Sequence, residues 1–137
     1  MSTMFTLWCE GYCELDNPTE VDVRDLMKKI EDWIVERPEF VLVSDEKGPE
    51  LVVAALFKKR RTLGPKWRVR IVGQEQLTLS YEGTTEQYEE FIESGCPTTL
   101  DIGCALTREF AILAISSTLN KEPILQKYEW IADPGLD

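Results

Sequence analysis

The chain has 137 residues, 43% of them hydrophobic and 29% charged, which is the composition of one packed globular domain and excludes a disordered or collagen-like chain. Acidic residues outnumber basic ones by 25 to 15, and the formal net charge of -10 argues against unspecific binding to nucleic acid or to anionic membranes. The chain has no histidine, which rules out Ser-His and Cys-His nucleophile pairs and disfavours an enzyme.

The first third of the chain predicts a strand followed by a helix. Apolar and polar residues alternate over Thr3–Glu10, as in a half-buried strand. Thr19 is expected to cap a helix, with Asp22 three residues later completing an acidic variant of the capping box. The apolar face of this helix follows at spacings of three and four, and comprises Val23, Leu26, Met27, Ile30, Trp33 and Ile34.

Two hairpins are expected next. Phe40–Ser44 and Leu51–Phe57 are apolar and β-branched, and the turn-forming cluster Asp45–Pro49 separates them. The second hairpin joins a strand that buries Trp67, Val69 and Ile71 to a strand that carries Leu77, Leu79 and Tyr81. Together these strands predict an antiparallel sheet.

The last third predicts two helices and a strand. Thr84 or Thr85 is expected to cap a short helix that Gly95 and Pro97 end. A longer helix is expected over Asp101–Leu119, apolar on nearly all sides from Phe110 to Ile115, and a final strand is expected over Leu125–Ile131. The fold class is therefore α+β, a single domain over residues 1–137 with an antiparallel sheet of five to six strands and three helices.

One stretch of the chain is strongly basic. Seven of the 15 basic residues lie between Lys58 and Arg70, with no acidic residue among them. The favoured interpretation is a solvated connection followed by a strand whose outward face carries Arg68 and Arg70. The alternative is a phosphate-binding patch in which Trp67 stacks on a base.

The expected partner-binding surface is acidic. Glutamates recur at spacings of three and four in the short helix, with one more just upstream, and the set is Glu82, Glu86, Glu89, Glu90 and Glu93. Like charges so close together destabilise a helix, and a sequence that keeps them is compatible with a surface that attracts a basic partner. A plain solvated helix face is the alternative. Carboxylates along one helix face do not converge on a single ion, and no calcium or other metal site is predicted.

The four cysteines are Cys9, Cys13, Cys96 and Cys104. Only the first pair comes close to the spacing of zinc ligands, so we expect reduced thiols, mostly buried, and no metal or other cofactor. The N-terminus lacks the basic flank and apolar run of a secretory signal, and no apolar run approaches the length that spans a bilayer. These features predict a cytoplasmic protein without a membrane partner, and they leave a homodimer possible.

The segment Leu100–Phe110, followed by Lys121-Glu122-Pro123 and a strand ending in Tyr128-Glu129-Trp130, resembles the C-terminal half of small immunity proteins from bacterial polymorphic toxin systems. In that family a helix with an Arg-Glu-Phe centre leads through a proline turn into a strand that ends near a tryptophan. The resemblance implies a non-enzymatic, cytoplasmic inhibitor. Such an inhibitor binds a cognate toxin, commonly a nuclease or deaminase, and blocks its active site.

Two other functions fit parts of the sequence. A secretion chaperone that cradles an effector protein has a similar size, charge and mix of elements, and would use an apolar partner surface. An enzyme that works with carboxylates would need a buried acidic pair in a cleft. The leading hypothesis is an immunity protein that neutralises a basic antibacterial toxin through its acidic surface, without contacting nucleic acid itself.

Overall fold

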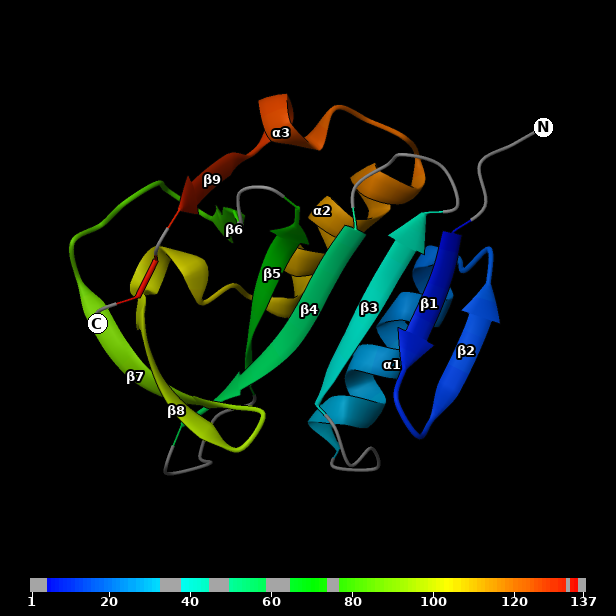
Figure 1. The fold of residues 1–137 in the computed structure, drawn as a ribbon, viewed down its shortest axis with the longest axis horizontal. Helices are drawn as coiled ribbons and strands as arrows, with labels where there is room; N and C mark the ends of the chain where they lie inside the picture. The colour runs from blue at the N-terminus through cyan, green and yellow to red at the C-terminus, as the bar shows by residue number, and fades with distance from the viewer. Residues whose placement is uncertain are drawn as a thin grey trace.

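The structure, a computed structural model, describes residues 5–32, 38–44, 50–58, 65–73, 77–132 and 134–135. Nine strands within these residues form one antiparallel sheet (Figure 1). Seven of them follow the order β2-β1-β3-β4-β5-β6-β9, and β7 and β8 branch off β4. The strands are β1 (Phe5–Cys9), β2 (Cys13–Asp16), β3 (Glu39–Ser44), β4 (Glu50–Phe57), β5 (Lys66–Val72), β6 (Leu77–Ser80), β7 (Tyr88–Glu93), β8 (Cys96–Asp101) and β9 (Glu129–Ala132).

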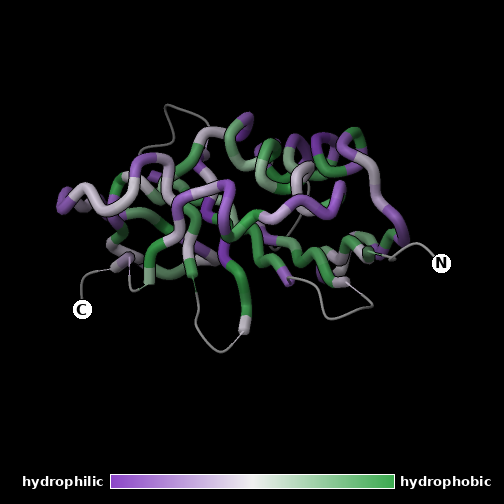
Figure 2. Tube along the Cα trace, turned by 90° about the horizontal axis from the view of Figure 1, so that it is seen from above, coloured by the Kyte–Doolittle hydropathy of each residue, from purple (hydrophilic) through white to green (hydrophobic). Residues whose placement is uncertain are grey.

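Two helices cover one face of the sheet. They are α1 (Glu20–Glu31) and α2 (Arg108–Leu119), which lie behind the strands in Figure 1 and form a separate layer in the view from above (Figure 2). The main core lies between this layer and the sheet. The expected acidic capping box is present, because Thr19 and Asp22 each bind the other's backbone N–H. The predicted apolar face of α1 is buried at Val23, Leu26, Met27 and Ile30, whereas Trp33 and Ile34 lie outside the described residues.

The opposite face of the sheet is only partly covered. The β7–β8 hairpin pairs with the last two residues of β4 and extends away from them along the front of the molecule (Figure 1). There Leu56, Phe91 and Leu100 form a second, smaller core. The hairpin therefore gives this end of the sheet a front layer, while no helix or strand that the structure describes lies in front of β1, β3 and the start of β4.

The fold class is confirmed as α+β with three α-helices among the described residues, but the sheet has nine strands instead of five to six. The predicted sequence of hairpins over residues 40–80 is confirmed, although the turn at 45–49 lies outside the described residues. The strand β2, which has only four residues, and the strand β8, which lacks regular alternation of apolar and polar residues, were not predicted. The expected helix over 101–119 is divided into a 3-10 helix (Ile102–Cys104) and α2, and the expected last strand begins with a single helical turn, α3 (Ile124–Lys127).

The basic stretch is built into the sheet. Side chains of β5 alternate as predicted, with Trp67, Val69 and Ile71 buried and Arg68 and Arg70 on the other face. Trp67 is fully buried and its Nε1 donates a hydrogen bond to Glu31 Oε2 at 3.2 Å, so it cannot stack on a base. Lys59, Arg60 and Arg61 lie outside the described residues.

Candidate functional site

The predicted acidic helix is wrong, because its second half is the strand β7. Successive side chains of a strand point to opposite faces. Glu89 and Glu93 therefore share one face of β7 with Phe91, while Glu90 points to the other face. The glutamates do not form one continuous stripe, and each has its own surroundings.

A tight turn explains why this segment is a strand. Ser94 and Gly95 connect β7 to β8, and both have positive φ, 50° and 82°. Two consecutive residues of positive φ form the turn that matches the twist of paired strands. The strand also separates the carboxylates that a helix would crowd together, and it carries two of them to basic partners. In the sequence, Gly95 predicts the end of a helix. The pair Ser94-Gly95 is also typical of a hairpin turn, and this second interpretation is the one that agrees with the structure.

The loop before β7 is fixed by one buried carboxylate. Asp101 is 1% exposed and accepts hydrogen bonds from Thr85 Oγ1 at 2.7 Å, from the backbone N–H groups of Thr85 and Gly103 at 2.9 Å, and from that of Glu86 at 3.3 Å. Burial alone would raise the pKa of Asp101, but these hydrogen bonds outweigh burial and hold the pKa below its ordinary value. The loop that carries Glu82 and Glu86 is thereby attached to the 3-10 helix.

Gly103 brings this 3-10 helix against β6. A Cβ atom at this position would lie 2.6 Å from Ser80 Oγ and 2.9 Å from the carbonyl oxygen of Gly83. The close approach allows Tyr81 N–H to donate to the carbonyl of Gly103 at 2.8 Å. A side chain at Gly103 would push the helix away from β6 and from the loop.

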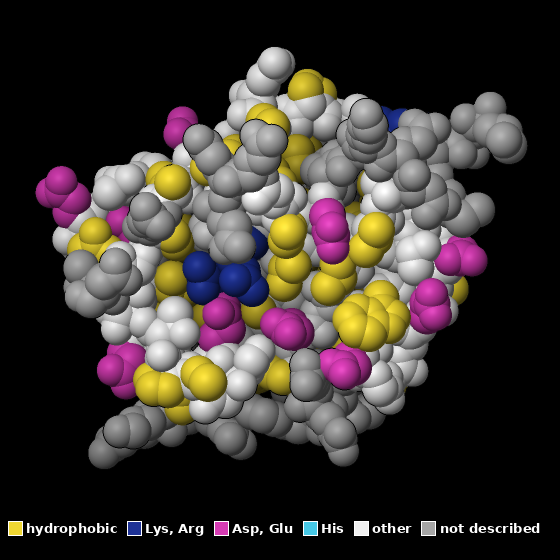
Figure 3. Space-filling view, viewed as in Figure 1, with side chains coloured by type: hydrophobic (Ala, Val, Ile, Leu, Met, Phe, Trp, Pro, Cys, Tyr) yellow, Lys and Arg dark blue, Asp and Glu magenta, His cyan; other side chains and the backbone are white. Residues whose placement is uncertain are grey.

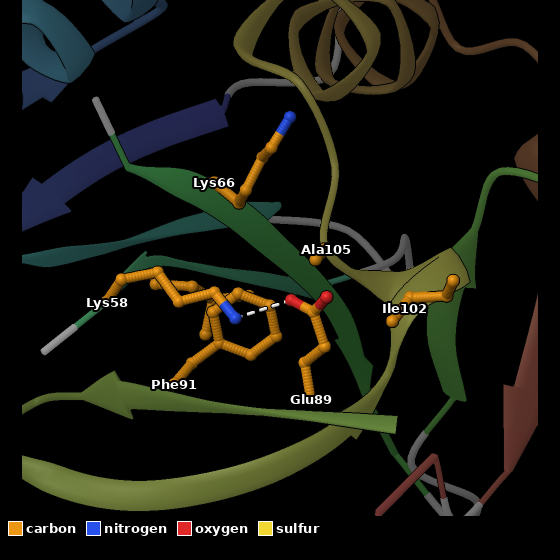
Figure 4. Close-up of a pocket in the computed structure, with 7 residues that line it drawn as sticks. Lys58, Lys66, Glu89, Phe91, Ile102 and Ala105 are labelled. Carbon is orange, nitrogen blue, oxygen red and sulfur yellow. Dashed lines mark hydrogen bonds and ion pairs between the residues drawn. The ribbon is translucent and has the colours of Figure 1, made fainter. Parts of the chain in front are cut away.

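A first pocket of about 340 Å³ lies between the hairpin and the sheet (Figure 4). Its lining residues are Leu56, Lys58, Lys66, Glu89, Phe91, Ile102 and Ala105. Lys58 Nζ forms an ion pair with Glu89 and lies 4.4 Å from the centre of the Phe91 ring, whereas Lys66 points away from this pair. The pocket thus already holds one cation against a carboxylate and an aromatic face, and both charged side chains are about half exposed.

A second pocket of about 400 Å³ adjoins the first and shares Ile102 and Ala105 with it. Its other lining residues are Tyr81, Glu82, Gly103, Leu106, Thr107 and Phe110. Tyr81 is 69% exposed, and its ring packs edge to face on Phe110 with 5.2 Å between the ring centres. Glu82 is therefore an exposed carboxylate beside an aromatic pair. The aromatic and apolar lining residues of both pockets were not predicted, because residues from five separate elements meet only in the folded chain.

The other predicted residues differ in their exposure. Glu86 and Glu90 are exposed, and Glu86 has a φ of 60° in the loop held by Asp101. Glu93 instead lies beneath the hairpin, where its Oε1 is 3.1 Å from Arg68 Nη1 and the two side chains are 12% and 13% exposed. Burial lowers the pKa of Arg68 even though Glu93 lies beside it. The structure thus brings Glu82 and Glu89 to two neighbouring pockets, leaves Glu86 and Glu90 at the surface, and places Glu93 in a structural ion pair.

None of the four cysteines, all of which the structure describes, forms a disulfide bond. Burial raises the pKa of Cys9 to about 11 and that of Cys104 to about 12, Cys13 is half-buried, and Cys96 is exposed. Over the described parts of the chain, no three cysteine, aspartate or glutamate side chains gather in a way that could hold a metal ion.

None of the helices that the structure describes has the length and apolar character needed to cross a membrane. Comparison with known protein families, with curated proteins and with solved structures found no match to this chain.

Proposed function

We propose that this protein is a non-enzymatic immunity protein that binds and neutralises a basic antibacterial toxin of the nuclease or deaminase type. The observation that supports this function best is the position of Glu82 and Glu89, two exposed carboxylates at adjoining pockets whose walls contain Phe110 and Phe91. A carboxylate beside an aromatic face suits an arginine or lysine side chain, through a charge-assisted hydrogen bond and a cation–π contact.

Lys58 gives an internal example of this recognition, because it pairs with Glu89 over the Phe91 ring. A toxin that acts on nucleic acid carries arginines and lysines where it holds phosphates. Such side chains would enter the second pocket beside Glu82 and would replace Lys58 at Glu89 in the first, and the inhibitor would cover the toxin's substrate-binding surface. The net charge of -10 would also accelerate the encounter with a basic partner.

The experiment begins with capture of bound proteins from the source cell's lysate at low and at high salt, followed by mass spectrometry. A basic protein that is lost at high salt is then purified, and its affinity for this chain and its toxic activity are measured. The test variant is Glu82→Lys with Glu89→Lys. We expect it to bind at least about tenfold more weakly and to lose neutralisation in proportion, because both carboxylates are reversed.

The matched control is Glu14→Lys with Asp16→Lys, which reverses two exposed carboxylates on β2 at the far edge of the sheet. It changes the net charge by the same amount, so it separates long-range attraction from contact at the pockets. Equal binding by the test variant and the wild type would refute the assignment of the surface. A partner that binds through an N-terminal fragment and keeps its activity would instead indicate the secretion chaperone.

A further inference from the structure

The face of the sheet opposite the helices carries a continuous row of side chains. The register places Trp8 opposite Val41, Val41 opposite Val52, and Val52 opposite Arg70, on the four neighbouring strands β1, β3, β4 and β5. Trp8 is 43% exposed, and the other three are partly exposed. Figure 3 shows hydrophobic side chains next to a group of basic ones on this face. We call this surface the open face.

Two charged residues on the open face, Arg70 and Glu50, form no ion pair among the described residues. Arg68 is neutralised by Glu93, but Arg70, two residues later on the same side of β5, forms no ion pair with any residue that the structure describes. Its Nε atom is buried without a hydrogen-bond partner. Glu50, at the start of β4, likewise forms no ion pair within the described parts of the chain. A half-buried guanidinium without a carboxylate leaves this Nε donor unsatisfied, which costs free energy.

These charges occupy one diagonal of a square of residues. On the open face Glu50 is opposite Val72 and Val52 is opposite Arg70. The charges of opposite sign therefore lie on one diagonal, and Val52 and Val72 lie on the other. Two molecules can meet through their open faces, related by a twofold axis that runs along the diagonal from Val52 to Val72. Each of these valines then contacts the same valine of the second molecule. Each Arg70 contacts Glu50 of the second molecule.

We propose that the open face is a homodimer interface, in which Arg70 of each molecule pairs with Glu50 of the other around Val52 and Val72. Charge complementarity favours a second copy because the same small area supplies both the cation and the carboxylate. Val72 is 42% exposed and would be covered in such a dimer, as would Trp8 toward the edge of the face. With the twofold axis along this diagonal, the strands of one sheet cross the strands of the other at a large angle, which corresponds to orthogonal sheet packing.

This interface differs from the proposed toxin-binding surface. Glu50 and Lys58 lie at opposite ends of β4, and the nearest residues of the two surfaces on this strand, Val52 and Leu56, lie about 13 Å apart. A dimer through the open face would leave the pockets beside Glu82 and Glu89 accessible. Failure of either proposal would leave the other unaffected.

The test is sedimentation equilibrium of the full chain from about 5 to 500 μM at physiological salt, a range that detects weak dimers. Arg70→Glu and Glu50→Arg should each weaken the dimer at least about tenfold, because each places like charges in contact twice in the symmetric pair. Combining the two substitutions should bring the dissociation constant back to within about threefold of the wild-type value. Lys28→Glu, an exposed position on the helix side, makes the same charge change as Arg70→Glu and should leave the dimer intact.

Three results would overturn the proposal. They are a monomeric wild-type protein at the highest concentration, a dimer that neither single variant weakens, and a double variant that does not recover. Circular dichroism checks that each variant is folded. Val72→Glu serves as a second probe, because it adds a charge at a position that is already exposed, and it should abolish the dimer while the monomer stays folded.

Discussion

Arg68 and Glu93 fasten the β7–β8 hairpin to the sheet through one nearly buried ion pair. Arg68 lies on β5 and Glu93 at the end of β7, so the pair joins two segments that are not paired as strands. Each side chain also has one buried polar atom without a hydrogen-bond partner, Arg68 Nε and Glu93 Oε2. Removing one partner would therefore cost more than the pair itself contributes.

We predict that Glu93→Gln lowers the free energy of unfolding by about 3 kcal/mol, because it leaves the guanidinium of Arg68 buried without a counter-charge. Urea denaturation measures this change. Glu90→Gln on the exposed face of the same strand is the control, with an expected change below about 0.5 kcal/mol. Equal stability of the two variants would show that the Arg68–Glu93 pair does not hold the hairpin.

Asp101 gives a prediction for the pH dependence of stability. Its pKa in the folded chain lies below the ordinary value of 3.8, so the unfolded chain binds more protons between these two values. The stabilisation from Asp101 is complete above pH 3.8 and is lost as the pH falls through the folded-state pKa. Asp101→Asn should lower the free energy of unfolding by about 2 kcal/mol at neutral pH, because the amide accepts fewer hydrogen bonds.

The difference between Asp101→Asn and the wild type should shrink as the pH falls below 3.8, since the carboxyl of the unfolded chain is then protonated while that of the folded chain stays ionised down to its lower pKa. Denaturation at a series of pH values measures it. A constant difference across this range would mean that the charge of Asp101 contributes nothing to stability.

At the scale of elements, the Ser94–Gly95 turn determines that residues 88–101 form a hairpin. Gly95 has a φ of 82°, which residues with a side chain rarely adopt, and a Cβ atom there would meet nothing within 4 Å. Any cost of a side chain at Gly95 therefore comes from the backbone conformation alone.

We predict that Gly95→Ala lowers the free energy of unfolding by about 1 kcal/mol, because alanine is strained at this φ. Gly73→Ala is the matched control, since Gly73 also has open space around it but no positive φ, and it should leave stability unchanged or slightly higher. Thermal or urea denaturation of both variants checks the prediction. A loss at Gly73 equal to that at Gly95 would remove the backbone explanation.

At the scale of the whole molecule, the four cysteines report on unfolding. Cys9 and Cys104 are buried, and their pKa values of about 11 and about 12 keep them almost wholly protonated at pH 8, whereas Cys96 is exposed. Each buried thiol lies among residues from several elements, so it becomes reactive only when the fold opens.

We predict that iodoacetamide at pH 8 modifies Cys96 first and Cys13 more slowly, and reaches Cys9 and Cys104 only in denaturant. Mass spectrometry of digested samples follows each site over time. Modification of Cys104 as fast as that of Cys96 in the native protein would contradict its burial.

The local sequence determined the elements whose signals lie within a few residues. The capping box of Thr19 and Asp22, the spacing of the α1 face and the alternation of Trp67, Val69 and Ile71 were all predicted correctly. These signals are physical properties of the segment itself, such as a hydrogen bond across three residues or a repeat that matches a helix or a strand. The α+β class followed from them.

Only the tertiary structure decided what the glutamates of residues 82–93 do. Their spacing suits one face of a helix, yet pairing with β4 and the basic partners Lys58 and Arg68 favour a strand and separate Glu89 from Glu93. The same holds for the pockets and for the diagonal of Glu50 and Arg70, which depend on the register between distant segments. Short segments of the sequence cannot predict such contacts, because residues far apart in the chain form them, and they contribute free energy only when the chain has folded.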